Sequence, residues 1–428
     1  MAHATVRFGL GHRPGESPPE DPRAWLLAQL RNPDPTRLPE PPSAAAGLMA
    51  LRDDRQTRPK PGESRSRAMF RRDALAQLGN ALATPAPFRE RLVWFWTNHF
   101  TVSLRRPQCA ALMGAFVEEA IRPHVTGRFA DMLLAVMRHP AMLLYLDNVR
   151  SVAPDSPVGR RDKRGLNENL ARECLELHTV SPDAGYTQED VTSFARILTG
   201  WSIDLRADPP GFRFRPFTHD PGDQVVMGQS FPAGEAGGVA ALGFLAAHPA
   251  THRHLATRLV RHFVADDPPQ DAVAQVAAVL RDTGGDLGAA AAAVVALHAA
   301  WQPQAKLRTP LDFLVATLRA LDPPQPQTDP PYLIASLALL GQPIWTAPQP
   351  NGWPDRASEW AGPEALMRRI DWSYAVAGRA AATADPASLA DATLGPLLRP
   401  ATLTAIRRAG SRRDAMTLLL TSPEFQRR

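Results

Sequence analysis

The segment 166–180 carries ionisable side chains at helical spacing. At about 100° per residue, Arg172, Glu173 and Glu176 share one helix face with Asn169. Two neighbouring carboxylates can transfer protons or bind a divalent ion, and an arginine can hold an anion. Arg172 is also four residues from Glu176, a spacing that often only decorates an exposed helix. A catalytic face and a solvated face therefore both stay open.

His178 lies on the other, apolar side of the same predicted helix. A ferritin-type iron site needs a glutamate three residues before the histidine, and Leu175 stands there instead. We therefore expect His178 to be a core histidine that bonds to the backbone or to a carboxylate. The next helix is predicted over 188–199, with Thr187 as its N-cap and Asp190 at the reciprocal capping position.

Polar side chains also interrupt two strongly apolar segments. Asn98 and His99 lie in a helical segment that is apolar nearly all round, as in a buried helix. Asp147 and Asn148 end a second apolar run. Buried polar groups need hydrogen-bond partners. These four residues therefore either satisfy one another in a structural network or line a pocket.

Helical patterning dominates the chain, and Pro-rich stretches lie between the helical segments. In 205–236 the pattern breaks: Phe212 and Phe214 alternate with arginines, and 225–227 follows a Pro-Gly-Asp turn. The sequence thus predicts an all-α fold, a multi-helix bundle array with one small β-hairpin inserted around 211–228. The predicted parts are N-terminal short helices, a helical bundle with the candidate site, the irregular insertion and a second helical bundle, at 1–63, 64–204, 205–236 and 237–428.

Composition limits the function classes. The chain has 48 basic and 43 acidic residues, but arginine supplies 45 of the basic ones, as GC-rich coding often produces. Basic and acidic residues are interleaved and no basic helix with aromatic spacing occurs, so we do not expect nucleic-acid binding. Two cysteines allow no disulfide framework and no CxxC metal site. Walker, dinucleotide-glycine, HExxH and GxSxG motifs do not occur.

The same composition bears on location. No apolar run reaches 18 residues, so we expect no transmembrane segment. The first residues lack the apolar core of a signal peptide. The expected location is cytoplasmic by default, or exported if the true start lies upstream.

Several long motifs resemble the bacterial domain-of-unknown-function 1800 family, from about residue 5 to the end of the chain. They are WFWTNHF, AMLLYLDN, NENLARE with ELHT, GYTQED, LTGW, HPAT, HFVADDP, GGDL, NGWP and SPEF, at 94–100, 141–148, 167–173, 176–179, 185–190, 198–201, 248–251, 262–268, 284–287, 351–354 and 422–425. The family carries no agreed activity. Its members are often encoded beside a hydrolase-like protein, and many look exported. The candidate polar residues, with Trp201 as a further binding residue, lie in these motifs, which favours a shared pocket.

Two functions follow from these residues. In the first, the protein is an enzyme whose pocket lies between helices near 94–100, 141–148 and 166–180. Glu173, Glu176 and His99 would be acid–base groups or ligands of a divalent ion such as Mg, Mn, Fe or Zn, and Arg172 would clamp an anion. The residues assigned to binding are Asn98, Asp147, Asn148, Asn169 and Trp201. In the alternative, the chain is a non-catalytic helical partner or scaffold for a neighbouring hydrolase-like protein.

Overall fold

Proline and helix-capping residues divide the chain into short helices. Within the described residues, eleven of the 22 α-helices begin at a proline. Proline suits this position because the first turn of a helix does not use its N–H groups and needs the φ that the ring imposes. The predicted capping box is present, since Thr187 and Asp190 each bond the other's backbone N–H. The prediction of an all-α fold with a small β insertion is confirmed.

The computed structural model describes residues 2–13, 15–16, 20–60, 62–163, 165–303, 305–321, 330–382 and 384–428. The N-terminal third holds α1 (Ala2–Arg7), α2 (Pro22–Arg31), α3 (Ala44–Thr57), α4 (Arg65–Ala83), α5 (Pro87–His99) and α6 (Met113–Ala115). The middle holds α7 (Phe129–Arg138), α8 (Pro140–Tyr145), the 3-10 helix η4 (Asn148–Arg150), α9 (Pro157–Asp162), α10 (Asn169–Glu173), the π-helix η5 (Cys174–His178) and α11 (Gln188–Ile197).

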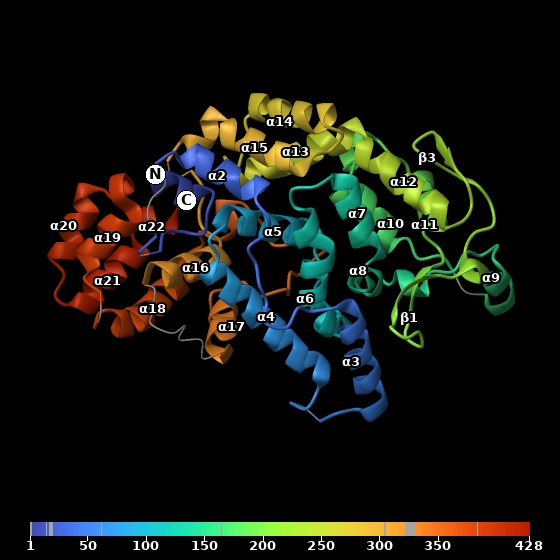
Figure 1. Cartoon of the computed structure of the whole chain (residues 1–428), viewed down its shortest axis with the longest axis horizontal. Coiled ribbons are helices and arrows are strands. Elements are labelled where there is room, and N and C mark those ends of the chain that lie inside the picture. The colour runs from blue at the N-terminus through green and yellow to red at the C-terminus, as the bar shows by residue number, and fades with distance from the viewer. Residues whose placement is uncertain are drawn as a thin grey trace.

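After a β insertion, helices continue to the end of the chain. They are α12 (Glu235–Ala247), α13 (Pro249–Phe263), α14 (Gln270–Asp282), α15 (Leu287–Ala296), α16 (Pro310–Leu321), α17 (Pro330–Leu339), α18 (Pro363–Ala380), α19 (Pro386–Leu394), α20 (Pro400–Arg407), α21 (Arg412–Thr421) and α22 (Pro423–Gln426). In Figure 1 the molecule is elongated: α18 to α22 form one end, α9 to α12 with the β insertion form the other, and α5 and α16 lie between them.

Two hydrophobic cores form along this body. The larger is built from α1–α3, α5–α8 and α10–α15 and includes Phe95 and Trp96 of α5. The smaller is built from α16 to α22 together with residues of α4, and Trp94 of α5 packs against it. Helix α5 is therefore apolar on both sides because it lies between two cores, which explains the apolar pattern seen in its sequence. The four-part division of the chain stays a prediction.

The β insertion consists of two hairpins rather than one. Strand β1 (Trp201–Asp204) pairs antiparallel with β2 (Gly211–Phe214), and β3 (Gln224–Val226) pairs with β4 (Gln229–Phe231). The sequence predicted that the segments now seen as β2 and β3 pair with each other. Instead, β2 pairs with β1 and β3 pairs with β4. Trp201 and Ile203 supply the buried face that β2 needs. The tight turn at Met227 and Gly228, with φ of 48° and 80°, connects β3 to β4.

The predicted helix over 166–180 is shorter and changes its winding. It begins at Asn169 and passes from α10 into the π-helix η5. In a π-helix the backbone bonds to the fifth residue, so the regular 100° wheel no longer applies beyond Glu173. His178 is nevertheless buried, as the wheel predicted, while Glu173 and Glu176 are half-buried.

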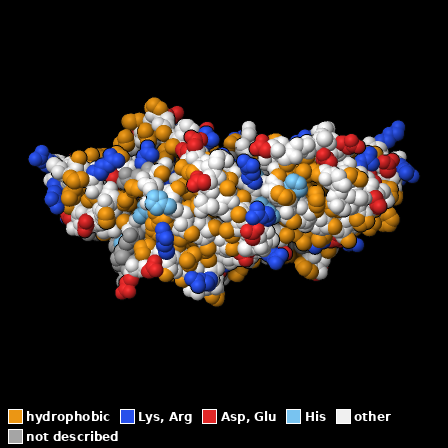
Figure 2. Space-filling model, turned by 90° about the horizontal axis from the view of Figure 1, so that it is seen from above, with side chains coloured by type: hydrophobic (Ala, Val, Ile, Leu, Met, Phe, Trp, Pro, Cys, Tyr) orange, Lys and Arg blue, Asp and Glu red, His pale blue; other side chains and the backbone are white. Residues whose placement is uncertain are grey.

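The outer surface is mixed in charge where Figure 2 shows it. Lys/Arg and Asp/Glu side chains are scattered among apolar ones over this face, without a continuous basic stripe. Among the helices of the described residues, none combines the length and apolarity needed to cross a membrane.

Two glycines of α12 provide a test of this packing. An added Cβ at Gly238 would lie 2.7 Å from the indole of Trp201, whereas at exposed Gly243 it would meet nothing within 4 Å. We expect Gly238→Ala to lower the free energy of unfolding by about 1–3 kcal/mol through overpacking. Gly243→Ala should raise it by about 0.5–1 kcal/mol through helix propensity. Urea unfolding measures both, and equal effects of the two substitutions would contradict the packing of Trp201 against α12.

Candidate functional site

Asn98 near the end of α5 fixes a distant segment of the chain. Its Nδ2 donates to the backbone oxygen of Trp353 at 2.9 Å, and the N–H of Trp353 donates to its Oδ1 at 2.8 Å. Gly352 makes this approach feasible, because a Cβ there would lie 2.4 Å from the backbone oxygen of Asn98. The NGWP turn is thus held against α5 by an amide that the sequence identified as needing a partner.

His99 belongs to a buried histidine cluster with His178 and His254. The ring centroid of His99 lies 5.9 Å from that of His178 and 6.0 Å from that of His254. His99 Nε2 donates to the backbone oxygen of His178 at 3.2 Å, and His254 Nε2 donates to that of Leu177 at 3.0 Å. Both ring nitrogens of His178 lack a hydrogen-bond partner in the described part of the chain, so the expected partner is not found.

Burial keeps the histidine cluster uncharged. Loss of water lowers the pKa of His99 well below its usual value, of His178 to about 3 and of His254 to about 4. The positive charge of Arg258 lowers the pKa of all three further. At neutral pH these rings are therefore neutral imidazoles.

Asp147, Asn148 and Trp201 lie together at the start of the β insertion. Asp147 pairs with Arg106 at 2.5 Å. Asn148 Nδ2 donates to the backbone oxygens of Leu198 and Trp201, at 3.0 and 2.9 Å. The buried indole of Trp201 lies under the guanidinium of Arg138, 5.3 Å from the ring centroid. The hydrogen bonds of Asn148 therefore link η4 to β1 and have a structural role.

The polar face of 166–180 is only partly shielded from water. Asn169 is exposed, and Arg172 Nη2 donates to Glu168 at 2.8 Å and to Gln188 at 3.0 Å. Burial, followed by the like charge of Glu176, raises the pKa of Glu173. Across the described residues no hydrogen bond or ion pair joins Arg172, Glu173 or Glu176 to His99, and no group of three or more His, Cys, Asp and Glu is placed to hold a metal ion. A site shared by these residues stays a prediction.

The structure places a cavity between the two hydrophobic cores, and Asn98 is the predicted binding residue that lines it. It has a volume of about 540 Å³ and lies between α5, α13, the start of α16 and residues 342–359. Trp94, Trp345 and Trp353 supply apolar walls, and Arg258, Arg261 and His262 enter from α13. We call it the central cavity. Pockets of this size between packed units are the usual places for small-molecule ligands.

His262 and Asp355 form an acid–base pair at the wall of the central cavity. His262 Nδ1 and Asp355 Oδ2 are 3.0 Å apart, and His262 Nε2 is buried without a hydrogen-bond partner among the described atoms. Burial lowers the pKa of His262 to about 4, although Asp355 acts in the opposite direction. His262, Lys306 and Arg428 hold the pKa of Asp355 below its usual range despite its burial. The imidazole is therefore neutral and oriented by a carboxylate.

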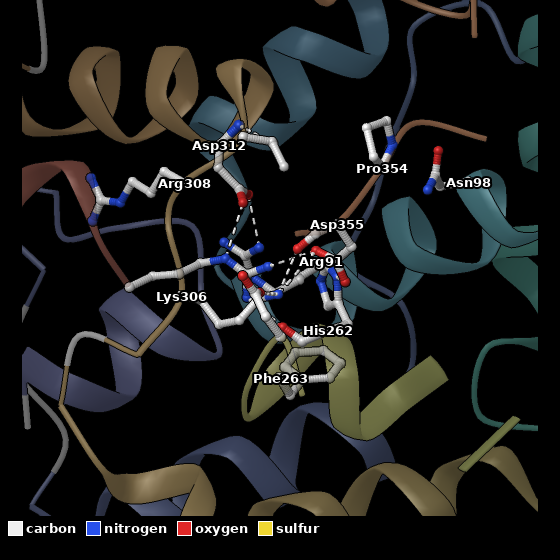
Figure 3. Close-up of polar contacts among 12 residues, drawn as sticks. Arg91, Asn98, His262, Phe263, Lys306, Arg308, Asp312, Pro354 and Asp355 are labelled. Carbon is white, nitrogen blue, oxygen red and sulfur yellow. Dashed lines mark hydrogen bonds and ion pairs between the residues drawn. The ribbon is translucent and has the colours of Figure 1, made fainter. Parts of the chain in front are cut away.

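Asp355 and Asp312 tie cations from three parts of the chain into one charged cluster. Arg91 Nη1 lies 2.8 Å and Arg428 Nε 3.1 Å from Asp312, and Lys306 pairs with Asp266 and approaches Asp355 at 3.8 Å. Figure 3 shows Asp312, Asp355 and His262 directed toward the same place as Arg91. Burial lowers the pKa of Arg91 to about 10, although Asp312 stabilises its charged form.

Arg258 and Arg261 extend this positive charge into the central cavity, where the charge of Asp355 favours the charged form of Arg258. Both are half-buried, and neither makes an ion pair within the described residues. The Nε of Arg261 and the Oγ1 of Thr97 are buried there without hydrogen-bond partners in the same part of the chain. The described lining holds four arginines against the carboxylates of Asp312, Asp355 and Glu359, so the cavity offers hydrogen-bond donors and a small excess of positive charge, which suits an anion.

The family model for DUF1800, described as a protein of unknown function, matches residues 3–427. The chain belongs to this family. No curated protein and no solved structure shows significant similarity to it. Three of the family-like segments, 94–100, 262–268 and 351–354, supply residues to the central cavity of this DUF1800 protein. The sequence contained these three motifs, so it held a signal for the site. Their spacing along the chain did not show that they meet around one cavity.

The buried histidines predict a pH-dependent stability. Below about pH 6.5 the unfolded chain protonates His178 and the folded chain does not, so stability is full above that pH and falls progressively until the pH reaches the folded pKa of about 3. At pH 4 the wild type should lose on the order of 3 kcal/mol of its free energy of unfolding through His178, because the folded pKa of this ring is about 3. His178→Leu should not show this loss. At neutral pH the variant should unfold at nearly the wild-type temperature, since no hydrogen bond of the ring is lost.

Urea unfolding over this pH range measures the effect. His298→Leu, at an exposed histidine, is the control and should retain the wild-type pH dependence. An unchanged slope in His178→Leu would contradict the buried, neutral state of this ring.

Proposed function

We propose that this DUF1800 protein binds an organic anion in the central cavity and that His262 with Asp355 transfers a proton to or from that ligand. The observation that carries the proposal is the pair Arg258 and Arg261, which line the cavity without an ion pair to any described residue. A guanidinium removed from water without a counter-charge is costly, and an anionic ligand offsets that cost.

The cavity walls define the kind of ligand. Trp94, Trp345 and Trp353 offer apolar surface, so the ligand carries an apolar or ring-shaped part as well as its charge. The two arginines suit a carboxylate or a phosphate, which a guanidinium can bind with two parallel hydrogen bonds. A volume of about 540 Å³ fits a metabolite-sized molecule and not a polymer.

The acid–base role follows from the orientation of His262. Asp355 accepts the Nδ1 proton, which leaves the Nε2 lone pair available for a substrate proton. Burial lowers the pKa of His262 to about 4, where the ring is a weak base. A bound anion raises the pKa of a neighbouring imidazole, so the ligand itself would strengthen this base.

Two earlier hypotheses remain as alternatives. A divalent metal at Glu173 and Glu176 is supported by the half-buried, like-charged pair, and elemental analysis of protein purified without chelators tests it. A partner or scaffold role is supported by the exposed apolar side chains of α18, among them Met367 at 55% and Tyr374 at 44% exposure. Size-exclusion chromatography with a co-expressed partner tests the second.

Charge removal in the central cavity tests the main proposal. We expect native mass spectrometry of gently purified protein, or a thermal-shift screen of organic carboxylates and phosphates, to identify a ligand. Arg258→Gln and Arg261→Gln should each weaken its binding by about tenfold or more, the equivalent of one charged hydrogen bond. Without ligand, both variants should be as stable as the wild type or more so, because a buried charge without a partner is removed.

Arg253→Gln is the matched control, because this arginine lies on the exposed side of the same helix. It should leave both affinity and stability unchanged. Ligand binding that survives the double substitution of Arg258 and Arg261, or a large loss of stability in the unliganded variants, would mean that these arginines are structural.

A further inference from the structure

A second hollow of the surface shares no lining residue with the central cavity. It has a volume of about 690 Å³ and lies between α3, η4 and the β1–β2 hairpin. Five arginines line it, from three different elements, against a single carboxylate, Asp204. Figure 1 shows α3 and β1 together on the lower side of the molecule. We call it the arginine groove, lined by Arg55, Arg150, Arg206, Arg213 and Arg215 with Ser202 and Asp204.

Local bonds use only part of this positive charge. Arg213 pairs with Asp204 at 2.6 Å, and Arg215 donates to the backbone oxygen of Ile203 at 2.5 Å. Arg150 is 70% exposed and lies 3.8 Å from Asp147, which is already paired with another arginine. The side chains of Arg55 and Arg206 form no hydrogen bond or ion pair with any described residue. The groove thus retains a net positive charge of several units.

The strand register aims a buried hydroxyl into the groove. Ser202 lies opposite Arg213 across the hairpin, so both side chains are on the same face, with Asp204 two residues further along. Trp201 and Ile203 point to the other face, into the core. Ser202 is 4% exposed, lines the groove, and its Oγ has no hydrogen-bond partner in the described part of the chain. An isolated buried hydroxyl is costly unless a ligand bonds to it.

We propose that the arginine groove binds a small molecule through its phosphate groups, with the Ser202 hydroxyl donating to one phosphate oxygen and Arg55, Arg150 and Arg206 balancing the charge. A phosphate carries more charge than one carboxylate and offers three acceptor oxygens, which matches several unpaired guanidinium groups around one hydroxyl. The groove is too large for orthophosphate alone and falls in the usual range for whole ligands.

The lining also decides between a small molecule and a nucleic acid. Single-stranded nucleic acids are held by aromatic side chains on which the bases stack, together with positive charge. No aromatic side chain lines the arginine groove within the described residues. The charge is therefore suited to phosphate groups without bases.

The test is isothermal titration calorimetry of the full chain with inorganic tripolyphosphate, fructose 1,6-bisphosphate and a short single-stranded DNA. We expect a phosphate compound to bind, and Arg150→Gln with Arg206→Gln together to weaken it by about tenfold or more. Tighter binding of tripolyphosphate assigns an inorganic chain as the ligand class, and tighter binding of the bisphosphate assigns a phosphorylated metabolite. Both results support the proposal.

Matched variants separate binding from folding. Ser202→Ala should weaken binding while leaving the unfolding temperature unchanged or raised, because the hydroxyl lacks a partner in the unliganded protein. Arg407→Gln, at an exposed arginine on α20, should bind as the wild type does. Arg258→Gln should also leave this binding unchanged, so the outcome is independent of the central cavity.

Three results would overturn the proposal. They are the failure of both phosphate compounds to bind, binding that the groove variants and Arg407→Gln affect equally, and tighter binding of the DNA than of either phosphate compound.

Discussion

The buried carboxylates Asp312 and Asp355 hold the two hydrophobic cores in register. Asp312 comes from α16 and bonds Arg91 of α5, while Asp355 follows the NGWP turn and bonds His262 of α13. Both also attract Arg428, whose backbone pairs with that of Lys306. Ion pairs removed from water give little net stability, but loss of one partner leaves a buried charge alone. These two residues therefore specify which segments meet between the cores.

The same cluster explains why the central cavity is electropositive. Its carboxylates pair with Arg91, Lys306 and Arg428, and the arginines of α13 make no ion pair with them, although the charge of Asp355 favours the charged form of Arg258. An apolar core would be simpler and more stable than this arrangement. Local conflicts of this kind concentrate at functional sites, because a ligand can resolve them. Arg258 and Arg261 are such a conflict, since each is partly removed from water at the cavity wall without an ion pair in the described structure, and only the more distant charge of Asp355 favours the charged form of Arg258.

The sequence predicted what local physics controls. The capping box at Thr187, the proline-initiated helices, the burial of His99 and His178 and the need of Asn98 for a partner all follow from neighbouring residues. Long-range pairing did not: nothing in the sequence shows that Asn98 meets Trp353 or that His262 meets Asp355. Each such contact joins residues far apart in the chain, so its partner is set by how the two cores pack. The hairpin partners of β2 and β3 were missed for the same reason. The π-helix η5 was missed because the prediction assumed the regular α-helical spacing of 100° per residue.

Helix α13 connects the region that the sequence identified with the cavity that the structure adds. His254, Arg258 and His262 are four residues apart and so share one face of the helix. At one end His254 bonds the backbone of η5 and contacts His99, and at the other end His262 bonds Asp355. Arg258 lies between them, lines the cavity and lowers the pKa of the histidine cluster. A change of charge in the cavity would therefore act on His262 at its wall and, through Arg258, on His178 and His254. Burial remains the main reason why these two rings are neutral, and Arg258 adds to it, so the 166–180 segment and the central cavity are coupled through one face of α13.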